Sequence, residues 1–166
     1  MRKKYKEMSQ EFLVKEGDLA PDFTFKDSNN KDLKLSNFLG KQVVLYFYPR
    51  DFTPGCTTEA SEFSRDYNKY YQNNIVIIGI SPDDEKSHSQ FREKMKIPFL
   101  LASDINKQIS QKYGVVGLKT FMGKEYEGIN RTTFLIDQNG KIIKIFNKVK
   151  PKGHSIEILN YLLKNN

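Results

Sequence analysis

The chain has 166 residues, of which 38% are hydrophobic and 13% aromatic, and this is enough for one globular domain with a packed core. Its 27 basic and 20 acidic residues give a net charge of +7, but most lysines lie singly among acidic residues, so the charge indicates no specific nucleic-acid partner. The absence of any apolar run of about 18 residues and the single cysteine, which excludes an internal disulfide, predict a cytoplasmic protein without a membrane span.

The first residues of the chain differ in character from the rest. Residues 1–16 are polar and charged with little periodicity, so we predict a basic N-terminal extension followed by a single domain over residues 17–166. Residues 22–26 and 31–35 alternate polar and apolar side chains on either side of the turn-forming residues 27–30. The domain should therefore open with a β-hairpin.

Two continuous apolar runs predict the central strands. Residues 43–48 are β-branched, aromatic or leucine, as in a strand buried on both faces of a parallel or mixed sheet, and the run stops at Pro49. Apolar residues then recur at helical spacing over residues 55–71, which predicts an amphipathic helix. Residues 75–80 are expected to form the second buried strand.

The middle of the chain alternates helical and extended patterns. Residues 81–84 are typical of a helix start, and that helix should continue to Lys94. A short strand over residues 99–101 and a helix over residues 104–112 are expected next. The glycine-rich stretch 114–128 is predicted to be a long loop, which in a small domain indicates a functional segment.

The C-terminal part completes the predicted fold. Residues 132–137 and 141–146 flank a turn at residues 138–140 and predict a hairpin, and a helix over residues 156–163 should close the chain. Strands that alternate with helices and end in a hairpin and a helix are typical of an α/β fold of the thioredoxin type. We expect a central mixed sheet flanked by helices, with the N-terminal β-hairpin beside it.

The connection between the first buried strand and the following helix carries the candidate reactive group. Thr53 is a good N-cap, Pro54 is favoured at the first helical position, and Cys56 then lies in the first turn. There the helix dipole and the free backbone N–H groups favour an anion, so the thiolate of Cys56 should be stabilised. The spacing is similar to a redox Cys-x-x-Cys site with Thr53 in place of the first cysteine. Cys56 is therefore interpreted as a lone nucleophile rather than as a small buried hydrophobe.

These residues resemble the peroxiredoxin signature Pro-x-x-x-Thr-x-x-Cys, which Pro49, Thr53 and Cys56 satisfy. The resemblance is to the bacterioferritin comigratory protein, or peroxiredoxin Q, subfamily, and it runs from the region of Gly17 to the C-terminus. The segments that carry it are residues 53–60, 79–81, 121–124 and 128–137. Only the basic extension lies outside it.

The resemblance implies a thiol-dependent peroxidase that reduces hydrogen peroxide and organic (alkyl) hydroperoxides without a metal or an organic cofactor. By position, Cys56 would be the peroxidatic cysteine, which attack on the peroxide converts to a sulfenic acid. Thr53 would supply the hydroxyl that contacts thiolate and peroxide, Pro49 would shield the site, and Arg131 would be the cation beside it. Glu59 matches a position that helps to orient the arginine, although it could equally be an ordinary acid in the first turn of a helix.

One position departs from the pattern of the subfamily. Many members carry a resolving cysteine five residues after the first, where this chain has Ser61. Because no intramolecular disulfide can form, the sulfenic acid has to be reduced by an external thiol, for which thioredoxin, glutaredoxin and small thiols are candidates, or has to pair with another molecule. We expect the protein to be a monomer or a weak homodimer.

Two alternatives remain open. The first is a redox-sensing binding module with a thioredoxin fold, in which Cys56 is oxidised without peroxidase turnover. The second is a cysteine hydrolase, which requires His88 or His154 beside Cys56. Both histidines have polar sequence neighbours, so we expect them at the surface. The sequence shows no metal-ligand spacing and no phosphate-binding glycine loop.

Overall fold

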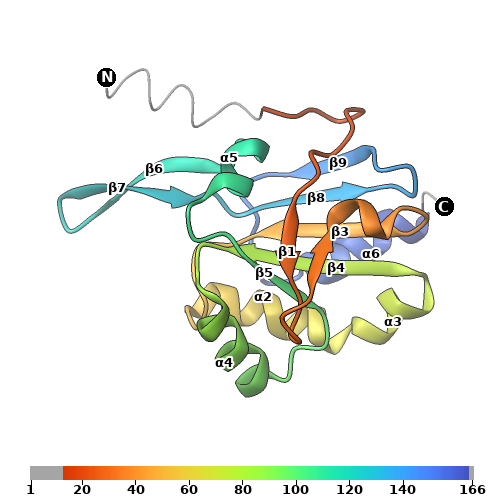
Figure 1. The fold of residues 1–166 in the computed structure, drawn as a ribbon, viewed down its shortest axis with the longest axis horizontal. Helices are drawn as coiled ribbons and strands as arrows, with labels where there is room; N and C mark the ends of the chain where they lie inside the picture. Colours follow the sequence, from red (N-terminus) through yellow and green to blue (C-terminus); the bar gives the residue numbers. More distant parts are fainter. Residues whose placement is uncertain (1–12, 165–166) are drawn as a thin grey trace.

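The computed structural model describes residues 13–164, and its centre is a five-stranded mixed sheet in the order β5-β4-β3-β8-β9 (Figure 1). The middle strand β3 (Gln42–Phe47) is buried at every residue. It pairs in parallel with β4 (Ile75–Ser81) and antiparallel with β8 (Thr132–Ile136). The outer strands are β5 (Leu100–Ser103), parallel to β4, and β9 (Ile142–Phe146), antiparallel to β8. The predicted mixed sheet and its two central strands are confirmed.

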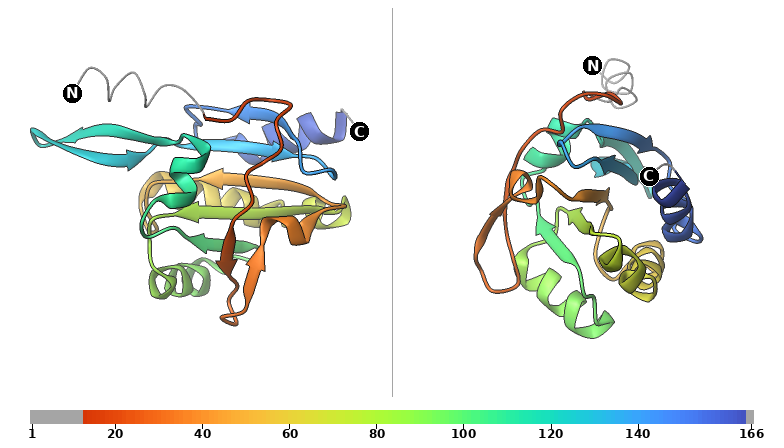
Figure 2. Two further views of the ribbon diagram at one scale, coloured as in Figure 1. Left: turned by 45° about the horizontal axis from the view of Figure 1, so that its top comes forward. Right: turned by 90° about the vertical axis from the view of Figure 1, so that its right-hand side faces the viewer.

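Helices cover one face of this sheet. They are α2 (Pro54–Arg65), α3 (Tyr67–Gln72), α4 (Glu85–Met95) and α6 (His154–Lys164). Their buried apolar residues share one cluster with alternate residues of β3, because successive side chains of a strand point to opposite faces. Figure 2 shows the yellow and blue helices on the side of the sheet opposite the orange N-terminal hairpin. The predicted thioredoxin-like α/β architecture is confirmed.

The other face of the sheet is covered by shorter elements. The predicted N-terminal hairpin is present as β1 (Thr24–Lys26) and β2 (Asp32–Lys34), followed by the short helix η1 (Leu35–Phe38). Helix α5 (Gln108–Tyr113) joins them in the second core cluster, and Tyr113 is fully buried there. The site described below therefore rests on a sheet that is packed on both faces.

Residues 114–128 do not form the predicted loop. They lie mostly in a long hairpin of β6 (Val116–Phe121) and β7 (Lys124–Ile129), which projects from the body of the molecule (Figure 1). Met122 and Gly123 form its two-residue turn, both with positive φ, as tight hairpin turns require. Of the glycines that suggested a loop, Gly114 ends α5, Gly123 forms this turn, and Gly117 and Gly128 pair with each other across the two strands.

Two predicted helices have different boundaries in the structure. The helix expected over residues 55–71 is interrupted at Asp66, which ends α2 and begins α3. The backbone of Asp66, with φ −95° and ψ 5°, departs from the α-helical conformation, and its carboxylate accepts hydrogen bonds from Arg65 and from the hydroxyl of Ser155. The helix expected from residue 104 begins only at Gln108, as α5. Asp104 lies before it, and its carboxylate accepts the backbone N–H groups of Ile109 and Ser110 in the first turn.

The predicted basic extension lies mainly outside the described residues, which begin at Leu13. Of its remainder, Val14 packs into the core, and the carboxylate of Glu16 accepts the backbone N–H of Ile145. Within residues 13–164, no helix is both long and apolar enough to cross a bilayer.

Candidate active site

Cys56 lies in the first turn of α2, where the chain leaves the end of β3. Thr53 has the extended backbone of an N-cap residue and Pro54 is the first helical residue, as predicted. The first intrahelical bond runs from the Thr57 N–H to the Thr53 carbonyl at 2.9 Å, so the N–H of Cys56 precedes the hydrogen-bonded turns. The Thr53 hydroxyl makes no capping bond and donates instead to the Arg50 carbonyl at 2.8 Å. The helix start therefore offers donors and a positive dipole end to the sulfur.

The register of the sheet brings Arg131 to this helix. β8 runs antiparallel to β3 with Thr132 opposite Phe47, so the start of β8 lies beside the end of β3. Arg131, the residue before β8, places Nη2 3.3 Å from the sulfur of Cys56, although 75 positions separate them in the sequence. A Cβ at Gly55 would lie 3.0 Å from this Nη2, so the glycine leaves room for the guanidinium.

Glu59 lies one helical turn after Cys56 and contacts the same guanidinium. Its Oε1 accepts from Nη1 of Arg131 at 2.7 Å, and its side chain is 1% exposed. Burial raises the pKa of Glu59 from its ordinary 4.5 to about 7, although the Arg131 charge acts in the opposite direction. Burial also opposes the charge of Arg131, but Glu59 and Cys56 raise the pKa of Arg131 above its ordinary value. The second oxygen, Oε2, has no hydrogen-bond partner among the described residues.

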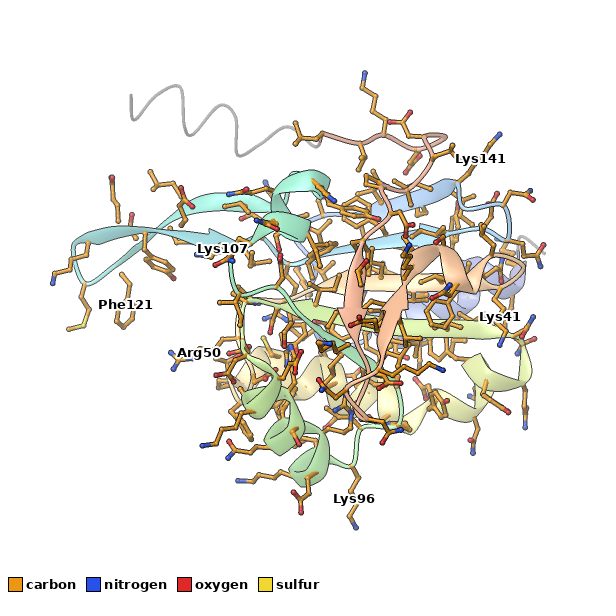
Figure 3. The ribbon with its side chains drawn as sticks, viewed as in Figure 1. Lys41, Arg50, Lys96, Lys107, Phe121 and Lys141 are labelled. Atoms are coloured by element: carbon orange, nitrogen blue, oxygen red, sulfur yellow. The ribbon has the colours of Figure 1, made fainter. Side chains whose placement is uncertain are left out.

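Of the sequence-predicted site residues, the structure brings Cys56 and Arg131 into contact, and Thr53 and Pro49 lie in the adjoining loop and helix start. Cys56, which is 1% exposed, lies in direct contact with Arg131. Thr53 is partly buried at the helix start, whereas Pro49 is exposed in the loop that precedes it. Ser61 lies exposed on α2, and Arg50, labelled in Figure 3, points outward from the loop.

Both histidines are buried, contrary to the predicted surface positions, and each is 2% exposed. Nδ1 of His88 lies 2.8 Å from Asp51, and Nε2 lies 3.1 Å from the Ala102 carbonyl. His154 places Nδ1 and Nε2 at 2.8 Å from Glu157 and Thr133. Since both nitrogens of each ring have partners other than Cys56, the geometry gives no support to a cysteine hydrolase.

Sequence reasoning overlooked Asp51, although it lies within the motif that carries the resemblance. Asp51 is 4% exposed and bonded to residues of α4. One signal was available: His88 precedes Phe91 and Met95 by three and seven positions, which places it on the apolar face of that helix. A polar residue on such a face needs a buried partner.

Comparisons with known proteins agree with this geometry. The sequence profile described as the AhpC/TSA family matches residues 17–145. Peroxiredoxin Bcp of Bacillus subtilis is 47% identical over 146 residues, which cover 88% of this chain and 93% of that protein. Peroxiredoxin Bcp of Escherichia coli is 40% identical over 149 residues, which cover 90% of this chain and 96% of that one.

Solved structures show the same relationship. A cysteine-to-serine mutant of Xylella fastidiosa PrxQ has a TM-score of 0.86 at 33% identity and covers 92% of this chain and 97% of that one. A cysteine-to-serine mutant of Xanthomonas campestris peroxiredoxin Q has a TM-score of 0.82 at 33% identity, with coverages of 87% and 92%. The chain belongs to the AhpC/TSA family. Within it, the chain is a thiol-dependent peroxidase, a peroxiredoxin of the Bcp and PrxQ group with a single cysteine.

Proposed function

We propose that Cys56 is the peroxidatic cysteine and that Thr53, Arg131 and Pro49 assist it in reducing hydrogen peroxide and organic hydroperoxides. The observation that supports this most directly is the 3.3 Å contact of Arg131 Nη2 with the sulfur, at a helix N-terminus. The positively charged guanidinium and the positive N-terminal end of the helix dipole both stabilise a thiolate. No metal or organic cofactor enters this chemistry.

The proposed reaction is a displacement on oxygen. The thiolate of Cys56 attacks the O–H oxygen of the peroxide, an S–O bond forms and the O–O bond breaks, which leaves a sulfenic acid on Cys56. The leaving oxygen takes a proton from solvent and departs as water or alcohol. Arg131 and the N–H of Cys56 stabilise charge as the O–O bond lengthens. The hydroxyl of Thr53 donates its hydrogen to the backbone carbonyl of Arg50, and the lone pairs on its oxygen can accept a peroxide O–H. Pro49, in the same loop, limits the access of water.

The second half of the cycle needs a reductant from outside. We infer that thioredoxin, glutaredoxin or a small thiol reduces the sulfenic acid, because the sequence contains one cysteine. Since Cys56 is 1% exposed, the reductant reaches it only when the helix start opens. We further propose a cytoplasmic monomer or weak homodimer whose peroxidase domain spans residues 17–166, in keeping with a family match that begins at residue 17.

Cys56→Ser provides the direct test of this assignment. We expect peroxide consumption, measured with thioredoxin, glutaredoxin and dithiothreitol as alternative reductants, to disappear in this variant, because no other thiol can form the sulfenic acid. Ser61→Ala, a change of similar size on the exposed side of the same helix, should keep the parent rate. Turnover that persists in the Cys56 variant would refute the assignment. Stoichiometric oxidation without turnover under every reductant would favour the redox-sensing module.

A further inference from the structure

A buried polar cluster ties the loop before Cys56 to helix α4. Oδ1 of Asp51 accepts the hydroxyl of Tyr48 at 2.6 Å. Oδ2 accepts the hydroxyl of Ser87 at 2.8 Å and lies 2.8 Å from Nδ1 of His88. The loop residue is thus held by the end of β3 on one side and by the first turns of α4 on the other.

The hydrogen-bond partners of His88 define where its protons lie. Nε2 is 3.1 Å from the carbonyl oxygen of Ala102, and because a carbonyl only accepts, Nε2 carries a hydrogen. Both carboxylate oxygens of Asp51 accept hydroxyl groups, and one of them also lies within hydrogen-bond distance of Nδ1 of the same ring. Asp51 and His88 therefore form a buried hydrogen-bonded pair, with side chains that are 1% and 3% exposed.

The loop before α2 is held by a second hydrogen bond at Asp51, and the next residue, Phe52, has a strained backbone. The backbone N–H of Asp51 donates to Oδ2 of Asp83 at 2.8 Å, and the hydroxyl of Ser81 donates to the same oxygen at 2.6 Å. Phe52 follows with φ of 67°, a left-handed conformation that is unfavourable for a bulky residue. Its ring packs edge-on against Phe91 of α4, with 5.1 Å between centroids. Such a conformation persists only where surrounding contacts hold it.

We propose that the Asp51–His88 contact is a positioning device for peroxide reduction, which holds the loop so that Thr53 and the N–H of Cys56 face the peroxide. The inference rests on the proposed roles of Thr53 and Cys56. One residue separates Asp51 from Thr53, and that residue is the strained Phe52, so movement of Asp51 is transmitted to the helix start. Separation of the pair would leave buried polar groups without a hydrogen-bond partner, which makes the contact costly to break. Neither Asp51 nor His88 touches the reacting atoms, so both act through the loop.

Two matched pairs of variants test the contact from both sides. The side-chain nitrogen of asparagine occupies the place of Nδ1 of histidine, and that of glutamine the place of Nε2. His88→Asn therefore keeps a donor to Asp51, whereas His88→Gln keeps only the donor to Ala102. On the loop, Asp51→Asn keeps an acceptor for Tyr48 and places an amide N–H beside Nδ1 of His88, which accepts it in the tautomer that carries the ring hydrogen on Nε2. Asp51→Ala keeps neither contact.

The first readout is the rate at which hydrogen peroxide oxidises Cys56, measured by stopped flow without reductant. His88→Gln and Asp51→Ala should slow oxidation by about ten- to a hundred-fold, the effect of a small misplacement at a reacting centre, and the asparagine variants should stay within about three-fold of the parent. Asp66→Asn, which weakens the buried contact with Ser155 at the junction of α2 and α3, should lower the melting temperature without slowing oxidation. Equal rates within each pair, or slowing by Asp66→Asn in proportion to lost stability, would overturn the proposal.

The second readout does not use peroxide. Hydrogen exchange of the Asp51 amide, which is bonded to Asp83, reports the position of the loop directly. Exchange should accelerate in His88→Gln and Asp51→Ala and stay at the parent rate in the asparagine variants, and uniform exchange in all four would also overturn the proposal. If the parent itself failed to react with peroxide, the proposed function would be wrong. The exchange data would still show whether the Asp51–His88 contact holds the loop. If a variant at one position does not fold, the pair at the other position makes the same comparison.

Discussion

Arg131 contacts two side chains that can each carry a negative charge, Cys56 and Glu59. Its planar guanidinium reaches both at once, Nη2 to the sulfur and Nη1 to Oε1, in a fork that a single ammonium group does not reproduce. The contact with Glu59 thereby fixes the orientation in which the cation faces Cys56.

Arg131→Lys should slow the oxidation of Cys56 by about ten- to a hundred-fold, because a point charge on a flexible stem cannot satisfy Glu59 and the sulfur together. Stopped-flow oxidation by hydrogen peroxide measures the rate, and circular dichroism checks that the fold is intact. Oxidation at the parent rate would show that Arg131 does not assist the reaction.

Glu59 should make the stability of the protein depend on pH. Its pKa in the folded chain is about 7 against an ordinary 4.5, so the folded state binds the proton more tightly than the unfolded state. The stabilisation that follows is complete below the unfolded pKa, declines as the pH rises through the window between the two values, and is lost above about pH 7. Glu59→Gln, which mimics the protonated acid, lacks this contribution.

The measurement is urea unfolding of parent and Glu59→Gln at several pH values from 4.5 to 8. The difference between their unfolding free energies should change by about 2 to 3 kcal/mol across this range, with the parent losing stability relative to the variant as the pH rises. A difference that does not vary with pH would mean that Glu59 titrates alike in both states.

At the scale of the element, the length of α2 decides what a second cysteine could do. The helix spans Pro54–Arg65 and so includes both Cys56 and Ser61. Five positions apart in a regular helix, two Cα atoms are roughly 8.6 Å apart, beyond the limit of about 7 Å for a disulfide. A bridge between these positions requires the opening turn of the helix to unwind.

We predict that Ser61→Cys, treated with one equivalent of peroxide, forms an intramolecular disulfide and loses helical signal, whereas the parent stops at the sulfenic acid or a mixed disulfide. Mass spectrometry without reductant distinguishes the products. A sulfenic acid beside an unreacted introduced thiol would instead show that α2 stays wound, so that an external thiol has to reach Cys56 in its folded pocket.

The strength of the sequence signal differed between elements for a physical reason. Residues 43–48 could be predicted as a strand because burial on both faces demands a continuous apolar run, and β3 is buried throughout. The hairpin of β6 and β7 was missed because its outer part, residues 120–121 and 124–127, faces solvent and shows no buried alternation. Phe121 at its tip, labelled in Figure 3, is 67% exposed.

At the scale of the whole molecule, the candidate site depends on strand order and register, which local patterns do not contain. The capping pattern of Thr53, Pro54 and Cys56 is local and could be read directly from the sequence. The approach of Arg131 depends on the pairing of β8 with β3, so before the fold was known only the family resemblance pointed to it. The partners of His88, Asp51 and Ala102, are also distant in the sequence, so only its place on the apolar face of α4 indicated that it is buried.

Because the chain has a single cysteine that is 1% exposed, the reactivity of that thiol reports local opening of the protein around it. A bulky alkylating reagent reaches the sulfur only in molecules whose helix start has opened, so the labelling rate, divided by that of an unstructured peptide thiol, gives the opening equilibrium. No engineered probe or second thiol complicates the signal. The free energy of the local opening that exposes Cys56 to a reductant can therefore be measured on the unmodified chain.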